Sequence, residues 1–121
     1  MKPAEVAGAP VQTRFGKPEV FPTGLVVEVA GPPTGGGFGP LFRASRFTVA
    51  PGGSTPPDTP AVPECWFIAS GDARLNHDGA DGPPRTGDIV TFAPNRTHRA
   101  VNGGDQELAV FCTLWDVDAR P

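Results

Sequence analysis

The sequence lacks the long apolar runs that membrane insertion or secretion needs. None of its apolar stretches approaches the roughly 18 residues of a membrane-spanning helix. The first 16 residues contain no apolar segment long enough for the core of a signal peptide. We therefore expect a cytoplasmic protein that makes no contact with a membrane.

Basic residues are also few. Ten Lys and Arg residues stand against 13 Asp and Glu residues, the formal net charge is -3, and the basic residues are scattered along the chain. Binding to nucleic acid depends on clustered cations that neutralise a row of phosphates. The sequence therefore predicts no nucleic-acid partner.

Cysteine is nearly absent. The two cysteines, Cys65 and Cys112, each lie inside an apolar run rather than in a loop. Thiols in such positions behave as small apolar side chains, and disulfides are rare in the cytoplasm. We expect both thiols to be buried and reduced.

Helical periodicity and internal repeats are missing as well. Apolar residues come in short or alternating runs, separated by turns that use most of the 16 Gly and 16 Pro residues. This pattern and the length predict an all-β fold with little helix, in one domain spanning residues 1–121. The expected strands cover roughly residues 11–15, 24–29, 42–50, 64–70, 73–77, 88–92, 97–101 and 107–116.

Two connections carry strong hairpin signals. The sequence HDGADGPP begins at His77, and NGGDQ follows Val101. Asn-Gly and Asp-Gly supply the positive φ angles that tight turns require. We expect antiparallel neighbours on either side of each connection, with His77 solvated at the tip of the first.

A first stretch of polar and turn-forming residues covers residues 52–71. Gly52 is followed after five residues by Asp58, and Pro60 stands two positions later. Glu64 follows after three more residues, and Gly71 after another six.

A second such stretch covers residues 87–102. Gly87 is followed after five residues by Ala93, and Asn95 stands two positions later. His98 follows after two more residues, and Asn102 after another three. Asn95 and the glycines are expected at sharp turns, because Asn tolerates a left-handed backbone better than other non-glycine residues.

The two stretches resemble the two motifs of the cupin family, G-x5-H-x-H-x3,4-E-x6-G and G-x5-P-x-G-x2-H-x3-N. The spacing matches throughout residues 52–102, whereas several identities differ. The resemblance implies a jelly-roll β-barrel, the double-stranded β-helix of cupins. It also implies a homodimer, because small cupins commonly pair sheet to sheet and the last expected strand is apolar on both faces.

In the family, the two histidines and the glutamate of the first motif, with the histidine of the second, bind a divalent metal inside the barrel. This chain keeps only Glu64 and His98 of that set. Asp58 stands in the first histidine slot and Pro60 in the second, where its side chain cannot bind a metal.

Three interpretations of Asp58, Glu64 and His98 stay open from the sequence. They can bind Fe, Mn, Ni or Zn with open coordination positions. Without a metal they can carry acid–base chemistry, because enclosure among apolar walls raises the pKa of a carboxyl group and a nearby imidazole exchanges protons near neutrality. They can also be purely structural, with Asp58 capping a loop, Glu64 paired with an arginine and His98 hydrogen-bonded in the core.

Strand alternation predicts the walls of the pocket. If Glu64 faces inward, its strand neighbours at alternate positions do too, and the same holds for His98. Alternation leaves open which face of the last strand lines the pocket, and at most one of two arginines on residues 42–50 points inward to bind a substrate carboxylate. The candidate wall residues are Trp66, Ile68, Ala100, Phe111, Trp115, Arg43 and Arg46.

The leading functional prediction is a small cupin enzyme of bacterial metabolism, for example of a natural-product pathway, that acts on a small organic molecule. Isomerase, dehydratase, cyclase or lyase chemistry suits a carboxylate and an imidazole, whereas oxygen activation usually uses more imidazole ligands. The alternative is a non-catalytic barrel that senses or carries a small ligand and has lost its metal. Pro60 supports this alternative.

Overall fold

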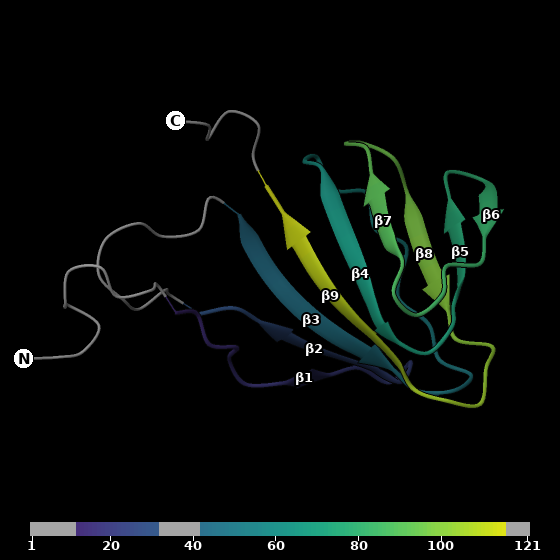
Figure 1. Cartoon of the computed structure of the whole chain (residues 1–121), viewed down its shortest axis with the longest axis horizontal. Coiled ribbons are helices and arrows are strands. Elements are labelled where there is room, and N and C mark those ends of the chain that lie inside the picture. Colours follow the sequence, from purple (N-terminus) through teal and green to yellow (C-terminus); the bar gives the residue numbers. More distant parts are fainter. Residues whose placement is uncertain (1–11, 32–41, 116–121) are drawn as a thin grey trace, which may run out of the picture.

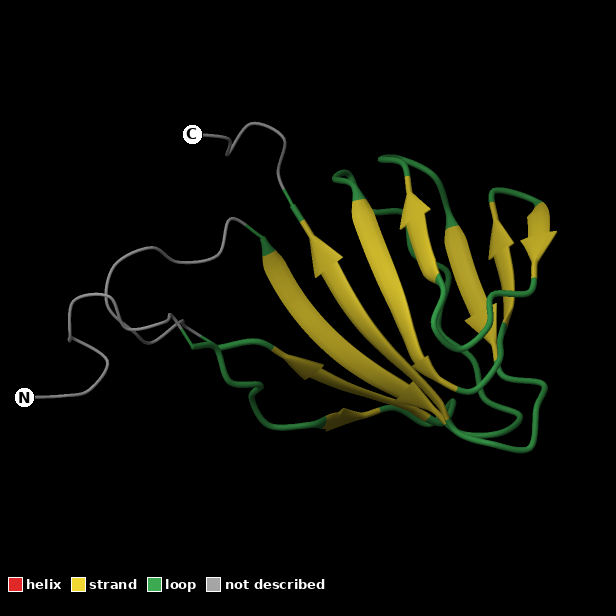
Figure 2. Cartoon of the chain, in the orientation of Figure 1, coloured by secondary structure: helices red, strands yellow, loops and turns green. Residues whose placement is uncertain are grey.

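The computed structural model describes residues 12–31 and 42–115, and within these ranges it contains strands but no helix (Figure 2). No described helix is therefore long and apolar enough to cross a membrane. The all-β prediction is confirmed. The strands are β1 (Glu19–Val20), β2 (Leu25–Val29), β3 (Arg43–Val49), β4 (Glu64–Ser70), β5 (Arg74–His77), β6 (Ala80–Gly82), β7 (Ile89–Phe92), β8 (His98–Val101) and β9 (Leu108–Leu114).

The strands form two antiparallel sheets. The larger sheet has six strands in the order β1-β2-β3-β9-β4-β7, and the smaller has three in the order β6-β5-β8. Figure 1 shows the smaller sheet beyond β7, at the opposite end of the large sheet from β1. Isolated bridges from Ser54 to Val101 and from Asp58 to His98 bring residues 54–58 along the free edge of β8.

Alternation along the strands separates a buried face from an exposed one. On β4, Glu64, Trp66 and Ile68 are buried, whereas Phe67 and Ala69 are exposed. Since successive strand residues point to opposite faces, the buried residues of all these strands meet in one core. The core consists of Leu25, Phe47, Val49, Trp66, Ile68, Ala73, Leu75, Phe92, Ala100, Leu108, Val110 and Cys112.

Two expected turns take the left-handed backbone that the motif spacing implies. Asn95 has a φ of 63°, and its N–H donates to the carbonyl of Pro60 at 2.8 Å. Gly71 has a φ of 80°, and a Cβ atom there would lie 2.6 Å from the carbonyl oxygen of Glu107. Only glycine therefore fits at residue 71 without displacement of the backbone.

Most expected strands match, and the errors lie at the ends and in short elements. The expected strand at residues 11–15 forms only isolated bridges where it is described, as between Phe15 and Ala30. β1 and β6 were not predicted, because runs of two or three residues carry no alternation to detect. Residue 116, the expected end of the last strand, lies outside the described residues.

The two hairpin predictions fare differently. The turn after His77 has φ angles of 53° at Asp78 and 89° at Gly79, and it joins β5 to β6 rather than to β7. The turn after Val101 joins strands of different sheets, so β8 and β9 are not neighbours and that prediction is wrong. Asn102 anchors this crossover, because its buried amide donates to the carbonyls of Val49 and Gln106 at 2.9 and 2.7 Å.

Candidate functional site

A cavity of about 270 Å³ opens between the inner faces of the two sheets. Its walls come from β2, β3, β4, β8 and β9, and from the segment that runs beside β8. Most of the wall is apolar, with a small group of polar side chains, which is typical of small-molecule pockets. The lining residues are Leu25, Val27, Ser45, Phe47, Thr55, Pro56, Pro57, Asp58, Glu64, Trp66, His98, Cys112 and Leu114.

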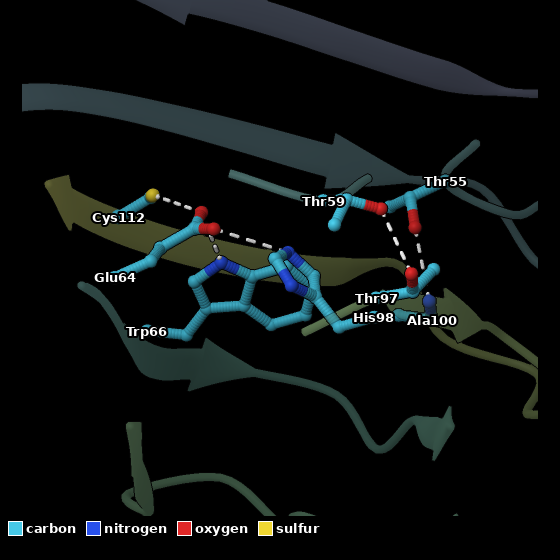
Figure 3. A network of polar contacts seen from close by, with 8 residues as sticks. All are labelled: Thr55, Thr59, Glu64, Trp66, Thr97, His98, Ala100 and Cys112. Atoms are coloured by element: carbon cyan, nitrogen blue, oxygen red, sulfur yellow. Dashed lines mark hydrogen bonds and ion pairs between the residues drawn. The ribbon is translucent and has the colours of Figure 1, made fainter. Parts of the chain in front are cut away.

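Glu64 is the most heavily bonded polar side chain of this wall (Figure 3). Its Oε2 atom accepts hydrogen bonds from Trp66 Nε1 at 2.9 Å and from Cys112 Sγ at 2.8 Å. Its Oε1 atom lies 3.1 Å from His98 Nε2, and no hydrogen bond of regular geometry reaches it. The two carboxylate oxygens are therefore not equivalent, and Oε1 is the one with accepting capacity left.

The charge state of Glu64 differs from the sequence expectation. Burial alone raises the pKa of this carboxyl, but the close approach of His98 Nε2, together with the hydrogen bonds from Cys112 and Trp66, outweighs it, so the pKa of Glu64 is lowered. The predicted rise is wrong, because the strand pattern could not reveal three donors aimed at one carboxylate. Burial, followed by the Glu64 carboxylate, raises the pKa of the Cys112 thiol, which keeps it protonated as a donor.

The His98 ring contacts Phe92, Trp66 and Glu64. His98 begins β8 with 2% of its surface exposed, and its ring stacks on Phe92 with centroids 4.1 Å apart and planes 16° apart. The ring of Trp66 meets it edge-on at 5.2 Å. Its Nδ1 atom is buried without a hydrogen-bond partner. The aromatic contacts therefore fix the ring that presents Nε2 to Glu64.

Asp58 is brought to the pair by the backbone. Its N–H donates to the carbonyl of His98 at 3.0 Å, and the His98 N–H donates back at 2.9 Å. The Asp58 side chain is exposed, so it lies at the rim of the group rather than under cover. Segment 54–58, although separated from β8 in sequence by β4 to β7, thus completes the constellation that the motif spacing predicted.

The three side chains fit the requirements of a divalent metal. Asp58, Glu64 and His98 each offer one ligand atom, and these atoms all lie within 4.8 Å of one another. Carboxylate oxygens with an imidazole suit Fe, Mn, Ni or Zn. The unpartnered Oε1 of buried Glu64 is a further feature that a cation would satisfy. Pro60 contributes no side-chain ligand, and its carbonyl is taken by Asn95.

Three of the predicted wall residues face inward, as strand alternation required. Trp66 lines the cavity itself. Ile68 and Ala100 are fully buried, but they lie in the core and do not line the cavity.

The other four predicted wall residues do not line the cavity. Phe111 and Arg46 lie on the outer face of the large sheet, where both contact Phe15 and Arg46 pairs with Glu28 at 3.1 Å. Arg43 is exposed at the start of β3. Trp115 follows β9, and its backbone N–H donates to the Pro63 carbonyl at 3.3 Å. The face of β9 that points inward is the one that carries Val110, Cys112 and Leu114, opposite the face with Phe111.

One contributor to the site, Cys112, was missed from the sequence, and the partial burial of His77 beside the core was missed as well. Cys112 donates directly to Glu64. The sequence did not indicate this contact, because alternation left open which face of β9 lines the pocket. His77, expected to be solvated, is half-buried, with its Nε2 atom buried and its ring edge-on to Phe92 at 5.3 Å. Alternation was the available signal, because His77 shares a face with buried Leu75.

An all-β chain whose antiparallel sheets enclose a largely apolar pocket has the architecture of a β-barrel. The family model of the cupin domain matches residues 45–114, more than half of the chain, and the chain belongs to this family. No curated protein matches the chain.

Solved structures with the same fold come from several bacteria. The protein plu4264 from Photorhabdus luminescens superposes with a TM-score of 0.71 at 18% identity, covering 83% of this chain and 82% of that one. A Cupin 2 conserved barrel domain protein from Salinispora arenicola gives 0.63 at 25% identity, covering 95% and 82%. KdgF from a Halomonas species gives 0.66 at 13% identity, covering 85% and 89%.

Proposed function

We propose that this cupin is an enzyme that moves a proton within a small organic molecule, as isomerases, dehydratases, cyclases and lyases do. One observation carries the proposal. Glu64 Oε1 and His98 Nε2 lie 3.1 Å apart, both side chains are almost fully buried, and both line the cavity. A carboxylate next to an imidazole at the wall of an apolar pocket is an arrangement suited to general acid–base catalysis.

The roles of the residues follow from their contacts. Trp66 and Cys112 occupy Oε2 and hold the carboxylate in place, which leaves Oε1 to share a proton with His98. A proton removed from the substrate passes to the Glu64–His98 pair, where it can exchange with solvent through the open side of the cavity before a proton is returned to another atom of the substrate or to its leaving group. One proton leaves and one returns, which is the balance that an isomerisation or a dehydration requires.

The same residues serve a metal-assisted form of this chemistry. Asp58, Glu64 and His98 would hold the ion, which when bound would polarise a carbonyl or hydroxyl oxygen of the substrate. Pro60 leaves three side-chain donors where the family has four. We therefore expect less than one equivalent of metal, by elemental analysis, in protein purified without chelators. One equivalent of Fe, Mn, Ni or Zn, absent from both Glu64→Gln and His98→Asn, would establish the metal-assisted form instead.

Exchange of substrate protons with solvent tests the proposal without knowledge of the final product. A panel of small enolisable hydroxyketones is incubated with the protein in D₂O, and loss of C–H signal is followed by NMR. We expect Glu64→Gln and His98→Asn each to slow exchange by about 100-fold or more. Glu107→Gln, which alters an exposed carboxylate, is the control and should leave exchange unchanged. Exchange that persists in both site variants would exclude the pair as the proton carrier.

Pro60 also supports a second candidate function, a non-catalytic barrel that binds a small ligand. This candidate expects ligand binding that depends on Glu64, with no solvent exchange into any bound molecule. The exchange experiment therefore separates the two functions.

A further inference from the structure

We infer that the pocket takes a small, largely apolar ligand that is neutral or cationic and donates a hydrogen bond to Glu64, and that it excludes carboxylates and phosphates. The inference rests on the proposed function in one respect, because it assigns the same cavity as the ligand site. It concerns the metal-free chain.

The charge of the residues that line the cavity supports the exclusion of anionic ligands. Asp58 and Glu64 both line the cavity, and no Lys or Arg is among its described lining residues. Negative charge stays in excess even when His98 is protonated. Arg46 cannot compensate, because Glu28 and Phe15 hold it on the outer face of the sheet. An anionic ligand would therefore enter against like charge in a poorly solvated space.

The hydrogen-bonding groups of the cavity wall support a ligand that donates a hydrogen bond to Glu64. The Trp66 N–H and the Cys112 thiol both donate to Glu64 Oε2, so neither is available to a ligand. An ionised carboxylate only accepts hydrogen bonds, and the two donors fixed on Oε2 match this form of Glu64. The hydroxyls of Ser45 and Thr55 also line the cavity, and each can donate as well as accept. The carboxylate oxygen of Glu64 left to accept is Oε1, which lacks a hydrogen bond of regular geometry. A hydroxyl or ammonium group satisfies it, whereas a carboxylate does not.

The volume sets the size of the ligand. The cavity measures about 270 Å³. A dry cavity of about 150 Å³ holds one benzene molecule, so the present one has room for about ten non-hydrogen atoms. The rings of Phe47 and Trp66, edge-on with centroids 5.1 Å apart, offer an aromatic wall to the apolar part of such a ligand.

Four probes that share one ring test the inference. Toluene, benzyl alcohol, benzylamine and benzoate are titrated into protein kept metal-free with a chelator. Binding is read from the indole N–H signal of Trp66 in NMR spectra, assigned with a Trp115→Phe variant. We expect benzyl alcohol and benzylamine to bind about tenfold or more tightly than benzoate, because the benzoate carboxylate meets like charge at Asp58 and Glu64.

Two variants locate the selectivity. Glu64→Gln should bring benzoate to within about threefold of benzyl alcohol, since the amide removes the charge and adds a donor. Because this buried change can disturb folding, Asp58→Asn at the exposed rim is the second variant and should weaken benzylamine selectively. Glu107→Gln should retain the wild-type order of affinities.

The outcomes separate the inference from the proposed function. Benzoate binding as tightly as benzyl alcohol, or an unchanged preference in both Glu64→Gln and Asp58→Asn, would overturn the ligand class while toluene binding preserves the pocket. If none of the four probes, toluene included, shifts the Trp66 signal, the cavity is not a ligand site and the proposed function falls with the inference.

Discussion

At the scale of single residues, the chemistry of this barrel is concentrated on one carboxylate. Glu64 on β4 receives donors from its own strand and from β9, and it faces an imidazole from the smaller sheet. Each partner contacts one oxygen, so two donors hold Oε2, whereas Oε1 faces His98 alone and is the atom that the proposed chemistry would use. Burial by itself would raise the pKa of this carboxyl, and the donors around it hold that pKa below its ordinary value.

The pH dependence of stability tests this charge. Because the folded pKa of Glu64 lies below its ordinary value of 4.5, its contribution is present above pH 4.5 and is lost as pH falls through the lowered value. We expect Glu64→Gln to destabilise the protein by about 2 kcal/mol at neutral pH. The difference from wild type should shrink towards pH 3 in urea unfolding measured at each pH.

The control for this experiment is the exposed carboxylate of Glu107. Glu107→Gln should follow the wild-type pH curve. A gap between wild type and Glu64→Gln that stays constant from neutral to acid pH would show that the carboxylate is not held in its charged form.

At the scale of elements, the site depends on turns that end strands at fixed positions. Gly71 ends β4 and packs against the backbone at Glu107. We expect Gly71→Ala to cost about 3 kcal/mol, because a positive φ and a backbone contact are both unfavourable for a side chain. Chemical denaturation measures the loss.

Two other glycines separate the effect of positive φ from the effect of the backbone contact. Gly87 has a φ of 92° with open space around it, so Gly87→Ala should cost about 1 to 2 kcal/mol from backbone strain alone. Gly82 has neither constraint, and Gly82→Ala should change stability by less than about 0.5 kcal/mol. Equal effects at Gly71 and Gly87 would contradict a role for the contact with Glu107.

At the scale of the whole molecule, the outer face of the large sheet presents a continuous apolar row. Phe67 lies opposite Phe111 on β9 and Ile89 on β7, and these side chains are 45%, 40% and 67% exposed. We predict that a second copy covers this row sheet to sheet, as the apolar outer face of β9 led us to expect from the sequence.

Light scattering after gel filtration checks the assembly. The wild-type protein should have twice the 12.6 kDa mass of the chain, and Phe67→Glu should yield monomers that retain their fold. Val20→Glu, which alters an exposed apolar residue on β1 at the far edge of the same sheet, should remain dimeric. A wild-type monomer, or a dimer that survives Phe67→Glu, would contradict the prediction.

The sequence by itself determined the all-β fold, most strand positions and the turns, because alternation and motif spacing are local properties of the chain. It also predicted that Asp58, Glu64 and His98 lie close together, because the two motifs that carry them meet inside one barrel. Only the tertiary structure decided which face of β9 lines the pocket, that β8 and β9 lie in different sheets, and that Arg46 points outward. Its largest effect is on Glu64, whose pKa falls rather than rises because β9 and β8 bring Cys112 and His98 to it from outside its own strand.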